Sequence, residues 1–361
     1  MPNNAPLPPM STIGILGGGQ LGRMLALAAA RLGMRTHIFC PDPESPAFDV
    51  TPRKTVAAYD DEAALAAFAD AVDVVTYEFE NVPVATARFL ARRKPLFPGA
   101  DALEIAQDRL KEKAFIAGLN IPVASYHAVE TLAELHHALT ALGAPAVLKT
   151  TRLGYDGKGQ RIISVPAELE AAFAALAPKP LVLEAFIPFE KEVSVVVARG
   201  ISGEVRAFEP AENIHRHHIL ATSTVPAAIS ADLGIAAREA AAAIVDALGY
   251  VGVLGVEFFV TGDDLLVNEI APRVHNSGHW TEAVCITDQF EQHIRAICGW
   301  PLGDPKRLAD VVMENLVGDD GLEFPARLGP GIRPHLYGKH EARPGRKMGH
   351  LNHVGRMPAA K

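Results

Sequence analysis

Residues 12–24 read TIGILGGGQLGRM, and this stretch decides the fold class of the N-terminal part. The apolar run at 12–16 predicts a short buried strand, and the alanine-rich apolar pattern through Leu32 predicts a helix that ends at Gly33. Alternation of strands and helices predicts a parallel sheet with right-handed crossovers. The further elements predicted here are strand 36–40, helix 62–71 and strand 72–77.

Composition limits the class of protein. A length of 361 residues predicts two or three domains, and 49% hydrophobic with 21% charged residues predicts a folded globular chain. The net charge of −8 argues against nucleic acid as a main partner. Three irregularly placed cysteines favour neither a disulfide framework nor a zinc site, and indicate a reducing cytoplasm.

The N-terminal tail and the apolar stretches predict neither secretion nor a membrane span. Residues 1–11 lack the basic and apolar regions of a signal peptide, and we expect a disordered tail. Charged residues interrupt the alanine-rich stretches before they reach membrane-spanning length.

The pattern changes after Asp108. A strand at 146–150 carries Lys149 and leads into the glycine-rich sequence GYDGKGQ at 154–160. The other elements predicted in this part are helix 108–118, helix 131–142, strands 161–165, 181–186 and 192–198, helix 231–248, and the hairpin 251–260 with 265–270.

The glycines after the first strand allow three interpretations. GGGQLG at 17–22 fits the dinucleotide pattern G-x-G-x-x-G, and Asp42 follows twenty residues later. A hydride-transfer enzyme is therefore one hypothesis. The same amides at a helix N-terminus suit any phosphate, and a purely structural tight turn is the third interpretation.

The second glycine-rich loop carries a lysine of its own. Lys149 is either an edge-strand lysine that reaches solvent or a phosphate ligand beside GYDGKGQ. Asp-Gly alone is typical of an ordinary hairpin. Three glycines plus Lys158 in seven residues instead favour a flap that closes over phosphates and excludes water.

Two carboxylates lie in the predicted hairpin. Which residues pair depends on the turn register, but two alternative registers both bring Glu257 and Glu269 close, with Asn268 adjacent. Like charges at that spacing raise each other's pKa unless a cation neutralises them, and paired carboxylates suit Mg²⁺. A solvated strand face is the alternative, which the apolar neighbours disfavour.

A block of polar residues follows the hairpin directly. Arg273, His275 and Asn276 offer a planar guanidinium and neutral donors, which suit a small planar oxyanion such as bicarbonate. Of the fourteen histidines, His275 and His215 have neighbours that indicate a role.

These residues resemble a known family. Lys149 with GYDGKGQ, 184–187 with Glu192, and Glu257 with 268–269 are similar to the nucleotide and metal parts of ATP-grasp enzymes. Longer matches resemble the N5-carboxyaminoimidazole ribonucleotide synthase family of purine biosynthesis, and the likeness runs from about 12 to 355. These matches are GILGGGQLGRM (14–24), TYEFENV (76–82), NEIAPRVHNSGHW (268–280) and RPGRKMGH (343–350).

The resemblance implies a mixed α/β and α+β fold in three domains. These are a Rossmann-like domain at 12–108, which precedes an ATP-grasp domain at 109–298 with a flap at about 120–188, and a small β-rich C-terminal domain at 299–361. It implies ATP-dependent carboxylation of 5-aminoimidazole ribonucleotide by bicarbonate through carboxyphosphate. It further implies Mg²⁺, with Mn²⁺ as an alternative, and a cytoplasmic homodimer.

The resemblance also implies site residues. Arg273, His275 and Asn276 would bind bicarbonate, with Lys149 also catalytic, and Glu257 and Glu269 would hold the metal. The ATP contacts would be Arg109, Lys149, Gly154, Tyr155, Asp156, Gly157, Lys158, Gly159, Gln160, Glu184, Ala185, Phe186, Ile187, Glu192, His215, Asn268 and Glu269. The contacts to the ribonucleotide would be Gly18, Gly19, Gln20, Leu21, Glu78, Tyr155, Asp156, Lys339, Arg346 and Lys347.

Three other functions compete with this one. A different ATP-grasp carboxylate–amine ligase would share the nucleotide half but would not need the basic C-terminal segment. An NAD-dependent dehydrogenase would bind nicotinamide and hydrolyse no ATP. A non-catalytic nucleotide-binding regulatory protein would bind ATP without turnover, and the intact carboxylate pair argues against it.

Overall fold

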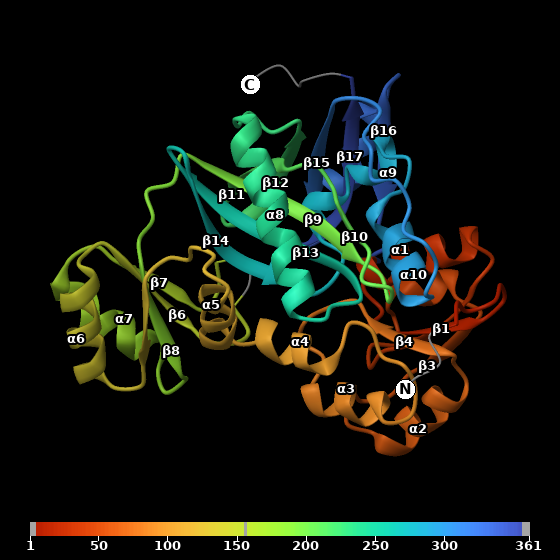
Figure 1. Ribbon diagram of the computed structural model, residues 1–361, viewed down its shortest axis with the longest axis horizontal. Coiled ribbons are helices and arrows are strands. Elements are labelled where there is room, and N and C mark those ends of the chain that lie inside the picture. Colours follow the sequence, from red (N-terminus) through yellow and green to blue (C-terminus); the bar gives the residue numbers. More distant parts are fainter. Residues whose placement is uncertain (1–4, 155–156, 356–361) are drawn as a thin grey trace.

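The computed structural model of the protein describes residues 5–154 and 157–355. Figure 1 shows an N-terminal α/β unit, a large sheet beside it, and a smaller α/β unit that projects from the opposite side of the molecule. No helix within 5–154 or 157–355 is long and apolar enough to cross a membrane.

The N-terminal unit is built on a parallel sheet of order β3-β2-β1-β4. All five residues of β1 are buried, which accounts for its continuous apolar sequence. Helix α1 ends before Gly33, whose φ of +72° suits glycine. The elements are β1 (Thr12–Leu16), α1 (Gln20–Arg31), β2 (Arg35–Phe39), η1 (Pro46–Val50), β3 (Arg53–Thr55), α2 (Glu62–Asp70), β4 (Val74–Tyr77), α3 (Val84–Ala91) and α4 (Ala100–Ala106).

The projecting unit is an antiparallel sheet of order β5-β8-β6-β7 covered by two helices (Figure 1). Its first helix starts with a capping box in which Thr131 and Glu134 satisfy each other's backbone N–H groups. Apolar side chains of both helices pack on the sheet in a core of their own. The elements are β5 (Tyr126–Val129), α6 (Leu132–Leu142), β6 (Ala146–Thr150), β7 (Gln160–Ile163), η2 (Pro166–Glu168), α7 (Leu169–Leu176) and β8 (Leu181–Ala185).

The large sheet forms the body of the molecule. Its main path is β14-β13-β9-β11-β12-β15-β17-β16, and β10 pairs with β9. Helix α8 contributes to one core against this sheet, and α10 contributes to another that also includes α1. The elements up to the last helix of this part are α5 (Arg109–Gly118), β9 (Lys191–Arg199), β10 (Val205–Ala207), β11 (Ala211–Arg216), β12 (Ile219–Val225), α8 (Ala231–Ala247), β13 (Gly252–Thr261), β14 (Asp264–Ala271), η3 (Asn276–Gly278), α9 (Thr281–Val284) and α10 (Gln289–Ile297).

The C-terminal strands continue the same sheet. Strand β15 pairs antiparallel with β12, with Thr222 opposite Glu314, and β17 and β16 follow at the edge. The segment 299–361, expected to form a small β-rich domain, therefore pairs through β15 with strand β12 of the large sheet. Its elements are β15 (Val311–Val317), α11 (Asp320–Glu323), η4 (Phe324–Arg327), β16 (Ile332–Leu336) and β17 (Lys347–Val354).

Candidate active site

The metal candidates face each other across the hairpin of β13 and β14. Glu257 pairs directly with Glu269, and directly opposed residues in an antiparallel pair share one face of the sheet. The next partner of Phe258 is Val267, so Asn268 is the extra residue of a β-bulge. Bulges redirect side chains at functional sites, and this one separates Asn268 from the regular ladder. The predicted proximity of the two strands' carboxylates is confirmed.

The electrostatics of this pair suit a cation. Burial, and then the charge of Glu269, raise the pKa of Glu257 to about 7. The guanidinium of Arg109 donates from Nη1 to Oε2 of Glu269 at 3.1 Å. Arg109 is the first residue of α5, whose N-terminus is capped by the Asp108 carboxylate. Arg109 thus pairs with only one of the two carboxylates, and a pair of carboxylates on neighbouring strands fits Mg²⁺.

Lys149 is paired inside the protein, as a lysine in an apolar strand requires. Its ammonium donates to Oε2 of Glu184 at 2.8 Å, and the buried Lys113 approaches the same oxygen at 3.4 Å. Burial lowers the pKa of Lys149, and the Glu184 charge opposes that change. Two lysines share one carboxylate, so this cluster carries an excess positive charge suited to phosphate.

The glycine-rich flap loop is described at both ends. Tyr155 and Asp156, predicted contacts of both ATP and ribonucleotide, lie outside the described residues. Gly157 and Gly159 have φ of +76° and +73°, and a Cβ at Gly157 would lie 2.5 Å from the His218 ring. Glycine is thus required where the flap approaches the turn between β11 and β12.

The other predicted nucleotide contacts come from three neighbouring segments. Gln160 pairs with Lys149 across the strands that flank the loop. Glu192 lies on β9 next to β11, and its carboxylate bonds with Nδ1 of His215. Although burial opposes it, this carboxylate raises the pKa of His215. Strand β8 ends at Ala185, and Phe186 and Ile187 follow it as partly exposed chain.

Arg273 links the large sheet to the N-terminal unit. Its Nη2 donates to Oε1 of Glu80 at 3.2 Å, its Nε donates to the other carboxylate oxygen, and its Nη1 reaches the Val274 carbonyl at 3.2 Å. Although burial opposes it, Arg273 lowers the pKa of Glu80 to about 2. Glu80 was not predicted as a site residue. Its place in TYEFENV just after a buried strand is the signal that identifies it.

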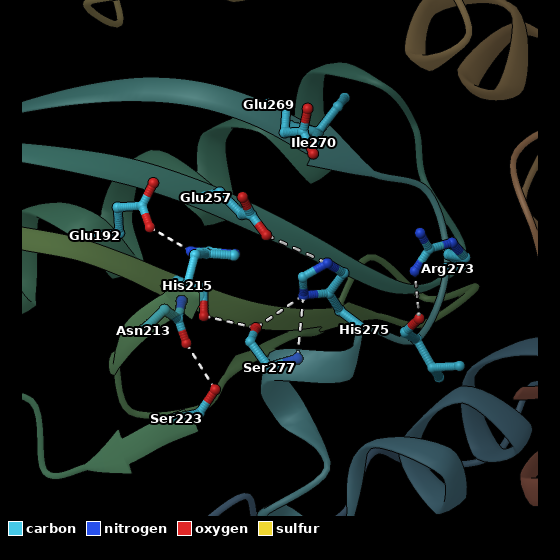
Figure 2. Close-up of polar contacts among 12 residues, drawn as sticks. Glu192, Asn213, His215, Ser223, Glu257, Glu269, Ile270, Arg273, His275 and Ser277 are labelled. Atoms are coloured by element: carbon cyan, nitrogen blue, oxygen red, sulfur yellow. Dashed lines mark hydrogen bonds and ion pairs between the residues drawn. The ribbon is translucent and has the colours of Figure 1, made fainter. Parts of the chain in front are cut away.

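His275 is a neutral imidazole between two polar groups (Figure 2). Burial lowers its pKa to about 3. Its Nε2 lies 3.4 Å from Oε1 of Glu257, and its Nδ1 lies 2.8 Å from Oγ of Ser277. The Ser194 hydroxyl donates to Ser277 at 2.7 Å. Neither serine was predicted, and no local sequence pattern reveals the contact between Ser194 and Ser277, which lie 83 residues apart.

Local sequence makes room for that histidine. A Cβ at Gly255 of β13 would lie 2.8 Å from the Cβ of His275, so only glycine lets the ring lie against the strand. Asn276 follows, and both polar atoms of its amide are buried without a hydrogen-bond partner among the described residues. An unpaired buried amide fits the bicarbonate role predicted for it.

The glycine loop after β1 holds a carboxylate of the protein itself. The N–H groups of Gly19 and Gly22 donate to Glu78 at 2.8 and 3.0 Å. Gly18 and Leu21 complete the loop with Gln20, which begins α1. This bonding explains the fingerprint without a dinucleotide.

The basic C-terminal residues gather near that carboxylate. Lys339 donates to the Lys347 carbonyl at 2.7 Å, and Arg346 donates to the Glu341 carbonyl at 2.9 Å. Burial, and then the neighbouring charge of Arg346, lower the pKa of Lys339 to about 8, and the Glu78 charge opposes this. Predicted ribonucleotide contacts from both ends of the chain thus meet.

A single cleft joins the nucleotide and bicarbonate candidates. We call it the nucleotide cleft. Its lining includes Glu80, Arg109, Leu153, Gly154, Glu269 and Arg273.

The fold and this site define an ATP-grasp enzyme, and comparison with known domains agrees. Residues 114–290 match the ATP-grasp domain, residues 10–107 match the ribonucleotide synthetase preATP-grasp domain, and residues 311–360 match the phosphoribosylaminoimidazole carboxylase C-terminal domain. This confirms the predicted fold class.

Full-length relatives specify the family. The chain is 56% identical over 352 residues to N5-carboxyaminoimidazole ribonucleotide synthase of Brucella melitensis, covering 96% of this chain and 97% of the relative. It is similar to the crystal structure of an ADP complex of N5-carboxyaminoimidazole ribonucleotide synthetase, with a TM-score of 0.94, 44% identity, and 97% and 94% of the two chains covered. The synthase of Aspergillus clavatus in complex with ADP and 5-aminoimidazole ribonucleotide matches with a TM-score of 0.89 and 31% identity, covering 95% and 93%.

The chain belongs to the N5-carboxyaminoimidazole ribonucleotide synthase family. It is an ATP-grasp ligase for the ATP-dependent conversion of 5-aminoimidazole ribonucleotide and bicarbonate to N5-carboxyaminoimidazole ribonucleotide. The predicted reaction is confirmed, and the dehydrogenase and regulatory alternatives are not supported.

Proposed function

We propose that this reaction proceeds through carboxyphosphate formed in the nucleotide cleft. A bicarbonate oxygen attacks the γ-phosphorus of ATP, the bond from that phosphorus to the bridging oxygen breaks, and ADP leaves. The exocyclic amine of the ribonucleotide then attacks the carboxyl carbon, or CO₂ released from it in the closed site. Phosphate departs and the amine loses a proton, which completes the N–C bond.

One observation carries this proposal: the groups suited to a triphosphate adjoin those suited to bicarbonate. Glu257 lies 3.4 Å from the His275 imidazole, and Arg109 lies 3.1 Å from Glu269. A γ-phosphate bound at the carboxylate pair would therefore lie beside an oxyanion held by Arg273 and Asn276. Positioning of this kind supplies most of the rate acceleration in phosphoryl transfer.

The residues present fit a bound Mg²⁺, with Mn²⁺ as the alternative. Glu257 and Glu269 face one another on paired strands, and burial raises the pKa of Glu257, so a cation would relieve an unfavourable charge. When bound, the metal would neutralise charge on the β- and γ-phosphate oxygens. Asn268, redirected by the bulge, would contact the nucleotide beside it.

Basic side chains of the protein would bind ATP, and the flap loop would exclude water from the site. Lys149 and Arg109 would contact the phosphates, since both come from elements that border the flap loop. The loop Gly154–Gln160 would close over them, with Lys158 contributing charge. Further ATP contacts would be Ala185, Phe186, Ile187, Glu192 and His215.

The Glu184 side chain would act on Lys149 and not on adenine. Its carboxylate is buried and engaged by Lys149 and Lys113. We therefore assign its side chain to orienting Lys149, and assign adenine recognition to the backbone that follows β8.

The bicarbonate groups act through hydrogen bonds and charge. Arg273 is oriented by Glu80, which leaves part of its guanidinium for the substrate. His275 is neutral at working pH because burial lowers its pKa to about 3, so it donates a hydrogen bond from Nε2 instead of adding charge. Asn276 supplies the unpaired amide.

The ribonucleotide would bind between the N-terminal loop and the C-terminal basic residues. Its phosphate would pair with Lys339, Arg346 and Lys347. These three basic side chains lie close enough that, in addition to burial, the charges of the other two lower the pKa of Lys339. Gly18 to Leu21 and Glu78 would contact the sugar and base side. We further propose that the active protein is a cytoplasmic homodimer, in line with the family resemblance.

Release of ADP tests the proposed sequence of steps. ADP should form only slowly when bicarbonate is omitted, and bicarbonate-dependent ADP release without the ribonucleotide would indicate that bicarbonate is phosphorylated first. Glu269→Gln should abolish most turnover while the protein stays folded. An unchanged rate in Glu269→Gln would contradict the metal assignment.

A further inference from the structure

A second group of metal-ligating side chains lies at the C-terminal edge of the large sheet. His335 of β16 and His350 of β17 occupy directly opposite register positions, and their rings stack with centroids 5.4 Å apart. Glu282 of the short helix α9 approaches both. Its Oε2 lies 3.2 Å from Nδ1 of His335 and 3.7 Å from Nε2 of His350.

The geometry is that of a convergent donor set. One ligand atom from each of the three side chains lies within 4.8 Å of the other two. Bonds of about 2.0–2.2 Å around a tetrahedral ion place its ligand atoms roughly 3.3–3.6 Å apart. The two measured separations from Glu282 lie close to that range, so small side-chain rotations bring the three donors onto one ion.

The unsatisfied polar atoms of this cluster point to a ligand. The His350 side chain is fully buried, and its Nε2 has no hydrogen-bond partner among the described residues. Oε2 of Glu282 also lacks a hydrogen-bond partner in the described part of the chain. Buried polar atoms without partners are costly, and a shared cation would satisfy both at once.

The surroundings prepare His350 to act as a ligand. Burial lowers its pKa well below the ordinary value, so the ring is neutral and a nitrogen lone pair is available. The buried Tyr337 hydroxyl lies 3.0 Å from the other ring nitrogen and fixes the ring's orientation. Such outer contacts are typical of metal-binding histidines. The Glu282 and His335 side chains are 23% and 21% exposed, which leaves a path for an ion and water.

We propose that Glu282, His335 and His350 bind one divalent transition-metal ion of the Zn²⁺ type. Two imidazole nitrogens and one carboxylate oxygen suit Zn²⁺ or Co²⁺ better than Mg²⁺ or Ca²⁺, which prefer oxygen ligands throughout. The ion would tie α9, which follows the bicarbonate block, to the C-terminal hairpin that carries Lys347. Its role is structural and it is separate from the Glu257–Glu269 pair.

Metal retention by the full-length protein tests this site. Wild type, His335→Gln, Glu282→Gln and the control His340→Gln are each incubated with Co²⁺ or Zn²⁺ under excess Mg²⁺, gel-filtered, and analysed for bound metal. His340 is exposed in the same C-terminal segment, so the control also removes one histidine. Wild type and His340→Gln should retain one more equivalent than the two site variants. Their Co²⁺ visible spectrum should show low-symmetry d–d bands, which the site variants lack.

Thermal unfolding gives an independent readout. Zn²⁺ should raise the unfolding midpoint of wild type and His340→Gln, and leave those of His335→Gln and Glu282→Gln unchanged. Equal metal content and equal Zn²⁺ shifts in wild type and His335→Gln would overturn the proposal, and the cluster would then be a metal-free imidazole–carboxylate contact. ATP turnover with Mg²⁺ is not a readout here, so failure of this site leaves the proposed mechanism untouched.

Discussion

The glycine loop after β1 and the nucleotide cleft handle charge in opposite ways. In the loop, a carboxylate from the chain itself, Glu78, accepts from the N–H groups of Gly19 and Gly22. In and beside the cleft, the lining residue Glu269 faces Glu257, and Lys149 with Lys113 exceed the single Glu184 charge. The chain itself thus satisfies these two N–H groups of the loop, whereas a bound cation and anion would balance the charges of the cleft.

This difference teaches why a glycine fingerprint alone does not identify a ligand. Glycine permits close approach to backbone amides, whatever the anion is. In the loop after β1, a distant residue of the chain supplies the anion. Glu78 lies 59 residues from Gly19 in the sequence, so no local pattern predicts their contact.

The largest effect is expected from a substitution that changes the charge of the carboxylate pair. Glu257→Gln should lower kcat by about 10²- to 10³-fold, since it removes charge that positions the phosphoryl group. It should not lower the stability of the metal-free protein, because burial and Glu269 already disfavour the ionised form of Glu257. Steady-state kinetics and thermal unfolding measure the two effects. Glu239→Gln, at an exposed position of α8, is the control.

A substitution in the loop should produce the opposite outcome. Glu78→Gln should lower the free energy of unfolding by about 1–3 kcal/mol, because the amide NH₂ group replaces one of the two oxygens that accept from Gly19 and Gly22. ATP affinity should stay unchanged. Denaturant titration and nucleotide binding would show this, with the exposed Glu44→Gln as the matched control. Unaltered stability would mean that the loop is not held by Glu78.

The pH dependence of metal–nucleotide binding sharpens the contrast. Burial, then Glu269, raise the pKa of Glu257 from 4.5 to about 7, and metal binding requires its ionised form. Affinity for Mg–ATP should therefore fall about tenfold per pH unit below about 7.

Stability of the metal-free protein should change with pH in the opposite sense. A carboxyl whose pKa is raised on folding stabilises the native state at low pH, and its contribution is lost as pH rises through about 7. Calorimetric titration with Mg–ATP measures the affinity, and thermal unfolding without metal measures the stability. Both are carried out on wild type and Glu257→Gln at several pH values. If the pH dependence of affinity or of stability persists in Glu257→Gln, another group is responsible for it.

The smallest expected effect concerns the base of the flap. Gly159 has φ of +73°, and a Cβ there would lie 2.7 Å from Oγ1 of Thr150. Gly159→Ala should therefore destabilise the protein by about 1–2 kcal/mol and raise KM for ATP. Gly118→Ala, in α5 with open space around it, should be neutral or stabilising by up to about 1 kcal/mol. Equal midpoints for the two variants would remove the steric argument.

Much of the fold was predictable because its signals are local. Helices α5 and α6 were predicted, and their sequences have apolar periodicity. In the structure they begin directly after the capping residues Asp108 and Thr131. The β13–β14 hairpin was predicted from its turn. In contrast, β11 and β12 carry the polar sequence around His215, and sheet neighbours decide their conformation. Propensity alone does not reveal such strands.

The sequence predicts individual candidate site residues, but not the contacts between them. Arg273 follows the predicted strand that carries Glu269, so the interaction between these two charges could be inferred from the sequence. The Glu80 contact joins residues 193 apart, and the Ser194–Ser277 contact joins residues 83 apart. The bulge at Asn268 depends on strand register, which the hydrophobic pattern fixes only to within a residue.

Oxygen-18 transfer tests the central claim most directly. Bicarbonate labelled with ¹⁸O is supplied with ATP, Mg²⁺ and 5-aminoimidazole ribonucleotide, and the released phosphate is analysed by mass. Phosphoryl transfer to bicarbonate in the nucleotide cleft predicts one labelled oxygen in each phosphate formed. Phosphate that contains only unlabelled oxygen, at full product yield, would contradict this account.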